Sequence, residues 1–165
     1  MLKTKVLLTG NFGVGKTSLF QQFILTKFDE RYLTTIGVKV DKKQVQLQEA
    51  LIEIFLWDVA GEVAQDKVPN SYFMGAHGII YVFDLTRPLT YQNIESDINY
   101  LKKIAPGASI KVVGNKKDLV DTERIEQVVD RLTVPYDMVM SAKTGENVEV
   151  LFTNLATEIF ENLKQ

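Results

Sequence analysis

Short apolar runs alternate with segments of helical periodicity along the chain, a pattern typical of an α/β fold. Five runs have the length and continuous apolar character of strands buried on both faces, at residues 6–8, 52–57, 79–83, 110–113 and 138–140. Residues 38–47 are more polar and include Asp41-Lys42-Lys43, so they predict an edge strand that forms a hairpin with residues 52–57.

Three later segments repeat apolar residues at helical spacing, and each predicts a helix with one face in the core. The first of these helices is predicted to begin at Pro88 and to end at Pro106-Gly107. The three faces consist of Tyr91, Ile94, Ile98, Leu101 and Ala105, of Ile125, Val128, Val129 and Leu132, and of Val148, Leu151, Phe152, Leu155 and Ile159. Strands that alternate with helices predict a mostly parallel sheet covered on both sides, with ligands beyond the carboxyl ends of the strands.

Composition and charge narrow the classes of protein that fit. A chain of 165 residues with 45% apolar residues fits a single domain over residues 1–165. The 19 basic and 21 acidic residues are well mixed and leave a net charge of −2, so we expect no nucleic acid partner. The absence of cysteine excludes disulfides, zinc–thiolate sites and thiol chemistry.

No signal for export or membrane attachment is visible. No apolar run approaches the length of a membrane span, which is about 20 residues. Leu2 excludes N-myristoylation, and the final Asn162-Leu163-Lys164-Gln165 is not a prenylation box. We therefore expect a cytoplasmic protein with no covalent membrane anchor in this chain.

A glycine-rich loop follows the first predicted strand. Gly10-Asn11-Phe12-Gly13-Val14-Gly15-Lys16-Thr17 matches G-x-x-x-x-G-K-[ST], and a helical stretch with Leu19 and Phe23 comes next. In this motif the glycines let backbone N–H groups close on phosphates, Lys16 adds a positive charge, and the Thr17 hydroxyl can ligate Mg²⁺. A strand-to-helix turn without a ligand is the weaker alternative, because Lys-Thr follows the last glycine.

A second segment, Trp57-Asp58-Val59-Ala60-Gly61-Glu62, ends the strand predicted at residues 52–57. An aspartate in this position can hold Mg²⁺ through water. The N–H of Gly61 can approach a γ-phosphate because glycine has no side chain. D-x-x-G alone is an ordinary turn signal, so its weight comes from following the glycine-rich loop.

Asn115-Lys116-Lys117-Asp118 follows the strand predicted at residues 110–113. The Asp118 carboxylate can accept hydrogen bonds from N1–H and N2–H₂ of guanine, and adenine lacks that pair of donors. Lys116 can lie along the base plane, and Asn115 can tie neighbouring loops together. Taken alone, the tetrapeptide is a solvated turn; after a phosphate-binding loop it predicts guanine recognition.

Two weaker segments complete the set. Ser141-Ala142-Lys143 follows the last predicted strand, where the Ala142 N–H can donate to guanine O6 and Lys143 can cover the ring. In the segment 28–37, Thr34 and Thr35 lie in a loop where a threonine ligates Mg²⁺ only when a γ-phosphate draws the loop in. Phe28 can stack on a purine, although a core phenylalanine fits the residues equally well.

With these five segments in this order, the chain resembles the Ras-like small GTPases over essentially its whole length. The segments 57–61 and 84–87 look closest to the Rab-type branch. The resemblance implies a P-loop NTPase three-layer sandwich, with a six-stranded, mostly parallel sheet and five helices. It implies a molecular switch that binds GTP or GDP with Mg²⁺, slowly hydrolyses GTP to GDP, and meets effector and regulator proteins through switch I (28–38) and switch II (58–74).

The same resemblance implies a role for each site residue. The phosphates would be held by Gly13, Val14, Gly15, Lys16, Thr17 and Ser18. The guanosine would be held by Phe28, Asn115, Lys116, Asp118, Ser141, Ala142 and Lys143. Mg²⁺ would be held by Thr17 and Thr35, and through water by Asp58. The residues expected to act in hydrolysis are Lys16, Thr35, Gly61 and Glu62.

Two residues depart from the family pattern. Glu62 stands where the family usually has a glutamine that orients the attacking water, and a carboxylate beside the γ-phosphate predicts impaired hydrolysis. Phe12 stands where the family usually has a small residue, so its ring would lie near the γ-phosphate, where a partner's arginine finger enters. The alternative function is therefore a nucleotide-bound interaction module with negligible GTP hydrolysis. An ATP-using P-loop enzyme is disfavoured by Asp118.

Overall fold

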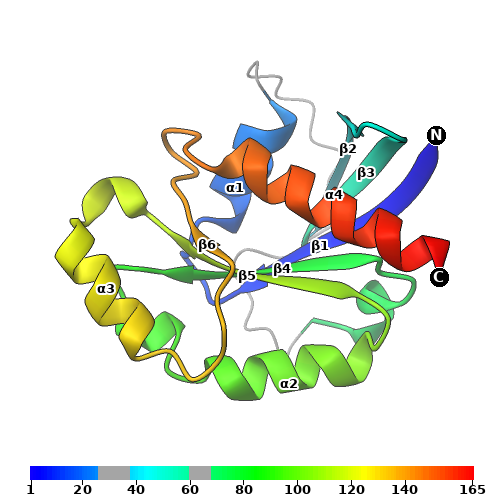
Figure 1. The fold of residues 1–165 in the computed structure, drawn as a ribbon. Helices are drawn as coiled ribbons and strands as arrows, with labels where there is room; N and C mark the ends of the chain where they lie inside the picture. The colour runs from blue at the N-terminus through cyan, green and yellow to red at the C-terminus, as the bar shows by residue number, and fades with distance from the viewer. Residues whose placement is uncertain (26–37, 60–67) are drawn as a thin grey trace.

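Six strands form one sheet in the computed structural model, which describes residues 1–25, 38–59 and 68–165 (Figure 1). The strands are β1 (Leu2–Gly10), β2 (Val38–Gln46), β3 (Leu51–Val59), β4 (Gly78–Asp84), β5 (Ser109–Asn115) and β6 (Met138–Val139). Their spatial order is β2-β3-β1-β4-β5-β6, with β2 antiparallel to β3 and every other pair parallel. The predicted edge hairpin and the mostly parallel sheet are confirmed.

Helices cover both faces of this sheet (Figure 1). The α-helices of the described residues are α1 (Lys16–Ile24), α2 (Ile94–Ile104), α3 (Thr122–Asp130) and α4 (Val148–Lys164), four where the resemblance implied five. Helices α1 and α4 pack on one face, where Phe23 stacks on Phe152 with ring centroids 3.5 Å apart. Helices α2 and α3 pack on the other face, through Ile98 and Val128 among others. The three-layer α/β sandwich is thus confirmed.

One predicted helix boundary is wrong. Pro88 begins a short 3₁₀ helix, η3 (Pro88–Thr90), and α2 starts only at Ile94. A continuous helix is prevented at Tyr91, whose φ of −130° and ψ of 5° lie outside the α region. The apolar residues predicted for this face are nonetheless buried, and α2 ends two residues before Pro106.

The carboxyl ends of the parallel strands bring the predicted motifs to one edge of the sheet. The pairing register sets Leu8 of β1 beside Asp58 of β3, and Asp84 of β4 beside Asn115 of β5. Two further 3₁₀ helices are η2 (Asn70–Phe73) and η4 (Lys117–Leu119). Among the described residues, none of the helices has both the length and the apolar character needed to cross a membrane.

Candidate functional site

The glycine-rich loop joins the end of β1 to the start of α1. Gly10, Gly13 and Gly15 all have positive φ, at 139°, 76° and 102°. Side chains would also collide here, because a Cβ at Gly10 would lie 2.2 Å from the Val82 carbonyl and one at Gly15 would lie 2.2 Å from Asn115 Nδ2. The loop therefore needs glycine for its backbone shape and for close packing. Because α1 has no side-chain cap at Gly15, its first N–H groups are left for a ligand or water.

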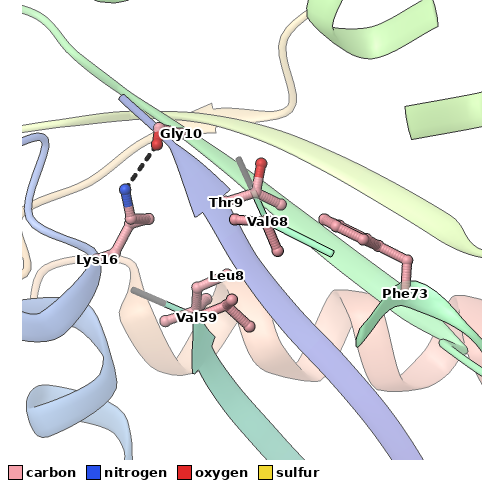
Figure 2. Close-up of a pocket in the computed structure, with 7 residues that line it drawn as sticks. All are labelled: Leu8, Thr9, Gly10, Lys16, Val59, Val68 and Phe73. Atoms are coloured by element: carbon pink, nitrogen blue, oxygen red, sulfur yellow. Dashed lines mark hydrogen bonds between the residues drawn. The ribbon is translucent and has the colours of Figure 1, made fainter. Parts of the chain in front are cut away.

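Lys16 lies inside the loop that precedes it. Its side chain is buried, and Nζ donates to the carbonyls of Gly10 at 2.6 Å and Asn11 at 3.0 Å; Figure 2 draws the first of these bonds. Burial lowers the pKa of Lys16 from 10.5 to about 8, against the attraction of Asp58. Two neutral carbonyls and the attraction of Asp58 do not offset the burial of this ammonium group, and an anion at the loop would compensate its charge better.

A small cavity lies beside the carboxyl end of β1, and Figure 2 draws the residues that line it. Its volume is about 10 Å³, room for no more than one water molecule. It is lined by Leu8, Thr9, Gly10, Lys16, Val59, Val68 and Phe73. This mostly apolar void is therefore part of the packing between β1, β3 and η2, and it is too small for a nucleotide.

Asp58 at the end of β3 contacts Thr17 in the first turn of α1. The Thr17 hydroxyl donates to Asp58 Oδ2 at 2.7 Å, while the buried Oδ1 finds no hydrogen-bond partner in the part of the chain that the structure describes. Burial raises the pKa of Asp58, against the Thr17 hydrogen bond and the nearby charges of Lys16 and Lys39. A hydroxyl and a carboxylate with one free oxygen are the donors that a hard cation such as Mg²⁺ prefers.

These two residues are too few to hold a cation by themselves. Over residues 1–25, 38–59 and 68–165, no three His, Cys, Asp or Glu side chains gather as a metal site. Mg²⁺ commonly keeps several waters and takes further oxygens from phosphates, so a sparse protein contribution fits this ion. The orphaned Asp58 oxygen is the structural sign that something else belongs there.

The two predicted base-binding segments are joined to each other and to the loop. Asn115 Nδ2 donates to the Val14 carbonyl at 2.8 Å, and its Oδ1 accepts from the Ala142 N–H at 2.9 Å. The Ser141 hydroxyl donates to Asp118 Oδ1 at 2.7 Å. Asn115 therefore ties neighbouring loops as predicted, and Ser141 orients the carboxylate of Asp118 through one of its two oxygens.

Lys116 reaches across the site. It adopts a left-handed backbone, with φ 70°, and its Nζ lies 2.7 Å from Asp84 Oδ2 while donating to the Gly13 carbonyl at 3.1 Å. Burial alone would raise the pKa of Asp84, but hydrogen bonds from Lys116 and Thr86 hold that pKa below its usual value. Asp84 is thus a charged, fully buried partner of Lys116, the lysine that the sequence predicts to lie along the base.

Known proteins resemble this chain over nearly all of its length. A family model described as Ras family matches residues 5–161. This chain belongs to the Ras family. It is 36% identical to Ras-related protein Rab-1A of Dictyostelium discoideum and 34% identical to GTP-binding protein ypt1 of Schizosaccharomyces pombe. Both alignments cover 96% of this chain and 81% of the relative. The resemblance to Ras-like small GTPases, and to their Rab-type branch, is confirmed.

Several predicted site residues of this Ras-family protein lie outside the described residues, namely Phe28, Thr35, Gly61 and Glu62. Ser18 and Lys143 are exposed. Phe12 is 59% exposed, and its carbonyl accepts a hydrogen bond from Arg87 Nη1 at 3.1 Å.

Sequence reasoning missed the contributions of Asp84 and Arg87 to this Ras-family site. Asp84 ends a buried strand at the ligand edge of the sheet, which is the same signal that singled out Asp58. The position of Asp84 at the end of a buried strand could therefore have identified it from the sequence. Arg87 carries no such signal, since its contact with the loop spans 75 residues of chain.

Proposed function

We propose that this chain is a guanine-nucleotide-dependent switch, which binds GTP or GDP with Mg²⁺ and slowly hydrolyses GTP to GDP. The observation that carries the proposal is the Thr17–Asp58 hydrogen bond at 2.7 Å, which joins the last residue of the glycine-rich motif to a buried carboxylate with one unpaired oxygen. The ypt1 relative is named as a GTP-binding protein, which supports the same ligand for this chain. This proposal includes a cytoplasmic location for a chain that acts as one domain.

The phosphate end of the site would work through Lys16, Thr17 and the loop backbone. The backbone N–H groups from Gly13 to Ser18 would donate to the phosphate oxygens. Lys16 would move its hydrogen bonds from the Gly10 and Asn11 carbonyls to the phosphates, where its charge is compensated. Mg²⁺, when bound, would neutralise charge between the last two phosphates; Thr17 would ligate it, and Asp58 would act through water.

The base end would select guanine through Asp118. Its carboxylate, oriented by the Ser141 hydroxyl, would accept from the two guanine donors. The Ala142 N–H would be shared between Asn115 Oδ1 and guanine O6, and Lys116 and Lys143 would flank the ring. Phe28 is also expected to contact a face of the purine.

Switching would depend on Thr35 and Gly61, which we expect to contact the γ-phosphate of GTP and nothing in GDP. A ligand shifts a conformational equilibrium only by its differential interaction with the two states, and these contacts supply that difference. Effector and regulator proteins would then bind residues 28–38 and 58–74 in the conformation that GTP favours.

A second candidate function is a nucleotide-bound interaction module with negligible hydrolysis. The observation that favours it is Phe12, a large exposed ring on the phosphate-binding loop. A ring there would obstruct an arginine finger brought by a partner, a device worth about 10³–10⁵ in rate. Glu62 in place of glutamine would act in the same direction.

The experiment that separates these functions is single-turnover hydrolysis of GTP by the Mg²⁺-loaded protein, followed by chromatography of GDP and GTP over hours. Conversion to GDP supports the timed switch. Tight GTP binding with no conversion supports the interaction module. Failure to bind GTP or GDP at all contradicts both, and Glu62→Gln, expected to raise conversion, tests the account of that residue.

A further inference from the structure

Each carbonyl of the phosphate-binding loop from Gly10 to Val14 accepts a hydrogen bond from a side chain, and most of these donors are cationic. Lys16 donates to the carbonyls of Gly10 and Asn11, and Asn115 donates to that of Val14. Arg87 donates to the Phe12 carbonyl and Lys116 donates to the Gly13 carbonyl, each at 3.1 Å. The loop backbone is thereby fixed from its carbonyl side, which leaves its N–H groups directed elsewhere.

Arg87 lies in the Rab-like segment 84–87, but that segment did not predict its contact with the loop. Its guanidinium also packs on Gly13, because a Cβ at that glycine would lie 2.9 Å from Nη1. A second contact has its donor on the loop and its acceptor on the turn, since Asn11 Nδ2 donates to the Leu89 carbonyl at 3.1 Å. The turn that follows β4 therefore holds consecutive loop residues from outside.

This turn is itself stiff, and Asp84 is the reason. Asp84 Oδ1 accepts from both the N–H of Thr86 at 2.8 Å and its hydroxyl at 2.6 Å. The Thr90 hydroxyl accepts from the Asp84 N–H at 2.9 Å and donates to the Arg87 carbonyl at 2.8 Å. The other oxygen of the same carboxylate faces Lys116. One buried acid therefore shapes the turn that carries Arg87 and aims the lysine that reaches Gly13.

We propose that this turn, residues 84–90, is a clamp on the phosphate-binding loop that sets how long a bound guanine nucleotide is retained, with Arg87 and Asp84 as positioning residues. The inference rests on the proposed function. Arg87, Lys116 and Asn115 keep their carbonyl bonds when Lys16 turns to the phosphates. These donors hold the peptide planes after residues 12–14 so that the N–H groups face the phosphates, and the linked bonds from Asp84 through Lys116 to Gly13 polarise one another. Loss of the clamp would let the loop relax and the nucleotide leave.

The test is the release of a fluorescent GDP analogue from the Mg²⁺-loaded protein after addition of excess unlabelled GDP. Arg87→Ala is expected to release about two to ten times faster, the effect of one net hydrogen bond. Asp84→Asn keeps an acceptor for Thr86 but removes the charge facing Lys116, and we expect release about ten times faster or more. Arg87→Lys should restore part of the loss, and Arg131→Ala, an exposed arginine at the end of α3, should match wild type.

A second readout separates positioning from general loosening of the fold. Competition against the labelled GDP gives the affinities of GDP and GMP for each variant. The clamp acts on the loop that would hold the outer phosphate, so Arg87→Ala should weaken GDP more than GMP. Equal weakening of both, or wild-type release from both Arg87→Ala and Asp84→Asn, overturns the clamp. A wild-type protein that binds no guanine nucleotide overturns the proposed function instead.

Discussion

The buried charge of Lys16 predicts that the nucleotide-free protein is less stable than a variant without that charge. Lys16 is 3% exposed, and burial lowers its pKa from 10.5 to about 8. The unfolded chain therefore keeps this proton up to about pH 10.5, whereas the folded chain loses it above about pH 8. Stability rises with pH between these values, and the full destabilisation is present below pH 8. Lys16→Met removes the charge and keeps a long side chain.

The magnitude follows from the shift and from the hydrogen bonds that would be lost. One pKa unit corresponds to 1.36 kcal/mol, so a fall from 10.5 to about 8 costs the folded state about 3 kcal/mol at pH 7. Methionine gives up the bonds to the Gly10 and Asn11 carbonyls, about 1 kcal/mol each. We expect the free energy of unfolding of nucleotide-free Lys16→Met to exceed that of wild type by about 1 kcal/mol at pH 7.

The assay is urea unfolding of nucleotide-free protein, followed by circular dichroism at about pH 7 and about pH 9.5, within the window where the shift acts. The advantage of Lys16→Met should shrink or reverse at the higher pH, because wild type has by then shed the proton. Lys102→Met, which removes an exposed lysine from α2, should show no such dependence. The reasoning would be refuted if Lys16→Met were less stable than wild type at pH 7, or if the difference in the free energy of unfolding were the same at both pH values.

Three further substitutions test the fold and the base site. Phe23→Ala should lower the free energy of unfolding by about 3–5 kcal/mol, because the buried ring stacks on Phe152; urea unfolding measures this, and a loss below about 1 kcal/mol would contradict the packing. Tyr81→Phe removes a 2.6 Å hydrogen bond to Asp97 and should cost about 1–3 kcal/mol in the same assay; an unchanged midpoint would mean the bond contributes nothing. Asp118→Asn should exchange guanine preference for xanthine preference in competition between GDP and XDP, and retained GDP selectivity would contradict the proposed base contact.

Most strands were predictable because they contain a continuous apolar run that is buried on both faces, whereas β2 was predictable as a polar edge strand beside β3. In β4, every residue from Gly78 to Asp84 is buried, and no alternating pattern competes with that interpretation. The start of α2 was not predictable from Pro88, because Pro is equally suited to the first turn of a 3₁₀ helix. The choice is made by Thr90, whose hydroxyl bonds to the backbone of the turn that precedes it.

The site shows the same division between local and long-range signals. The glycine loop and Asn115 belong to short patterns in which each residue type has a local reason to be present. The function of Arg87 depends on the strand order that brings β4 beside β1, and no neighbour in sequence signals it. The role of Asp84 depends likewise on its register partner Asn115, which sets the adjacent Lys116 within reach.

The shifted pKa values of Lys16 and Asp58 link ligand binding to the stability of the fold. Burial pushes Lys16 toward its neutral form and Asp58 toward its neutral form, so neither charge is well accommodated by the described residues alone. An anionic phosphate would favour the charged lysine, and a divalent cation would favour the charged aspartate. If a phosphate and a divalent cation bind there, the free energy that destabilises the nucleotide-free fold would be recovered on binding. The free energy of unfolding would then rise with ligand concentration. A variant that removes the buried charge of Lys16 should therefore weaken nucleotide binding and stabilise the nucleotide-free fold. Measured on one protein, the affinity for nucleotide should fall while the free energy of unfolding rises.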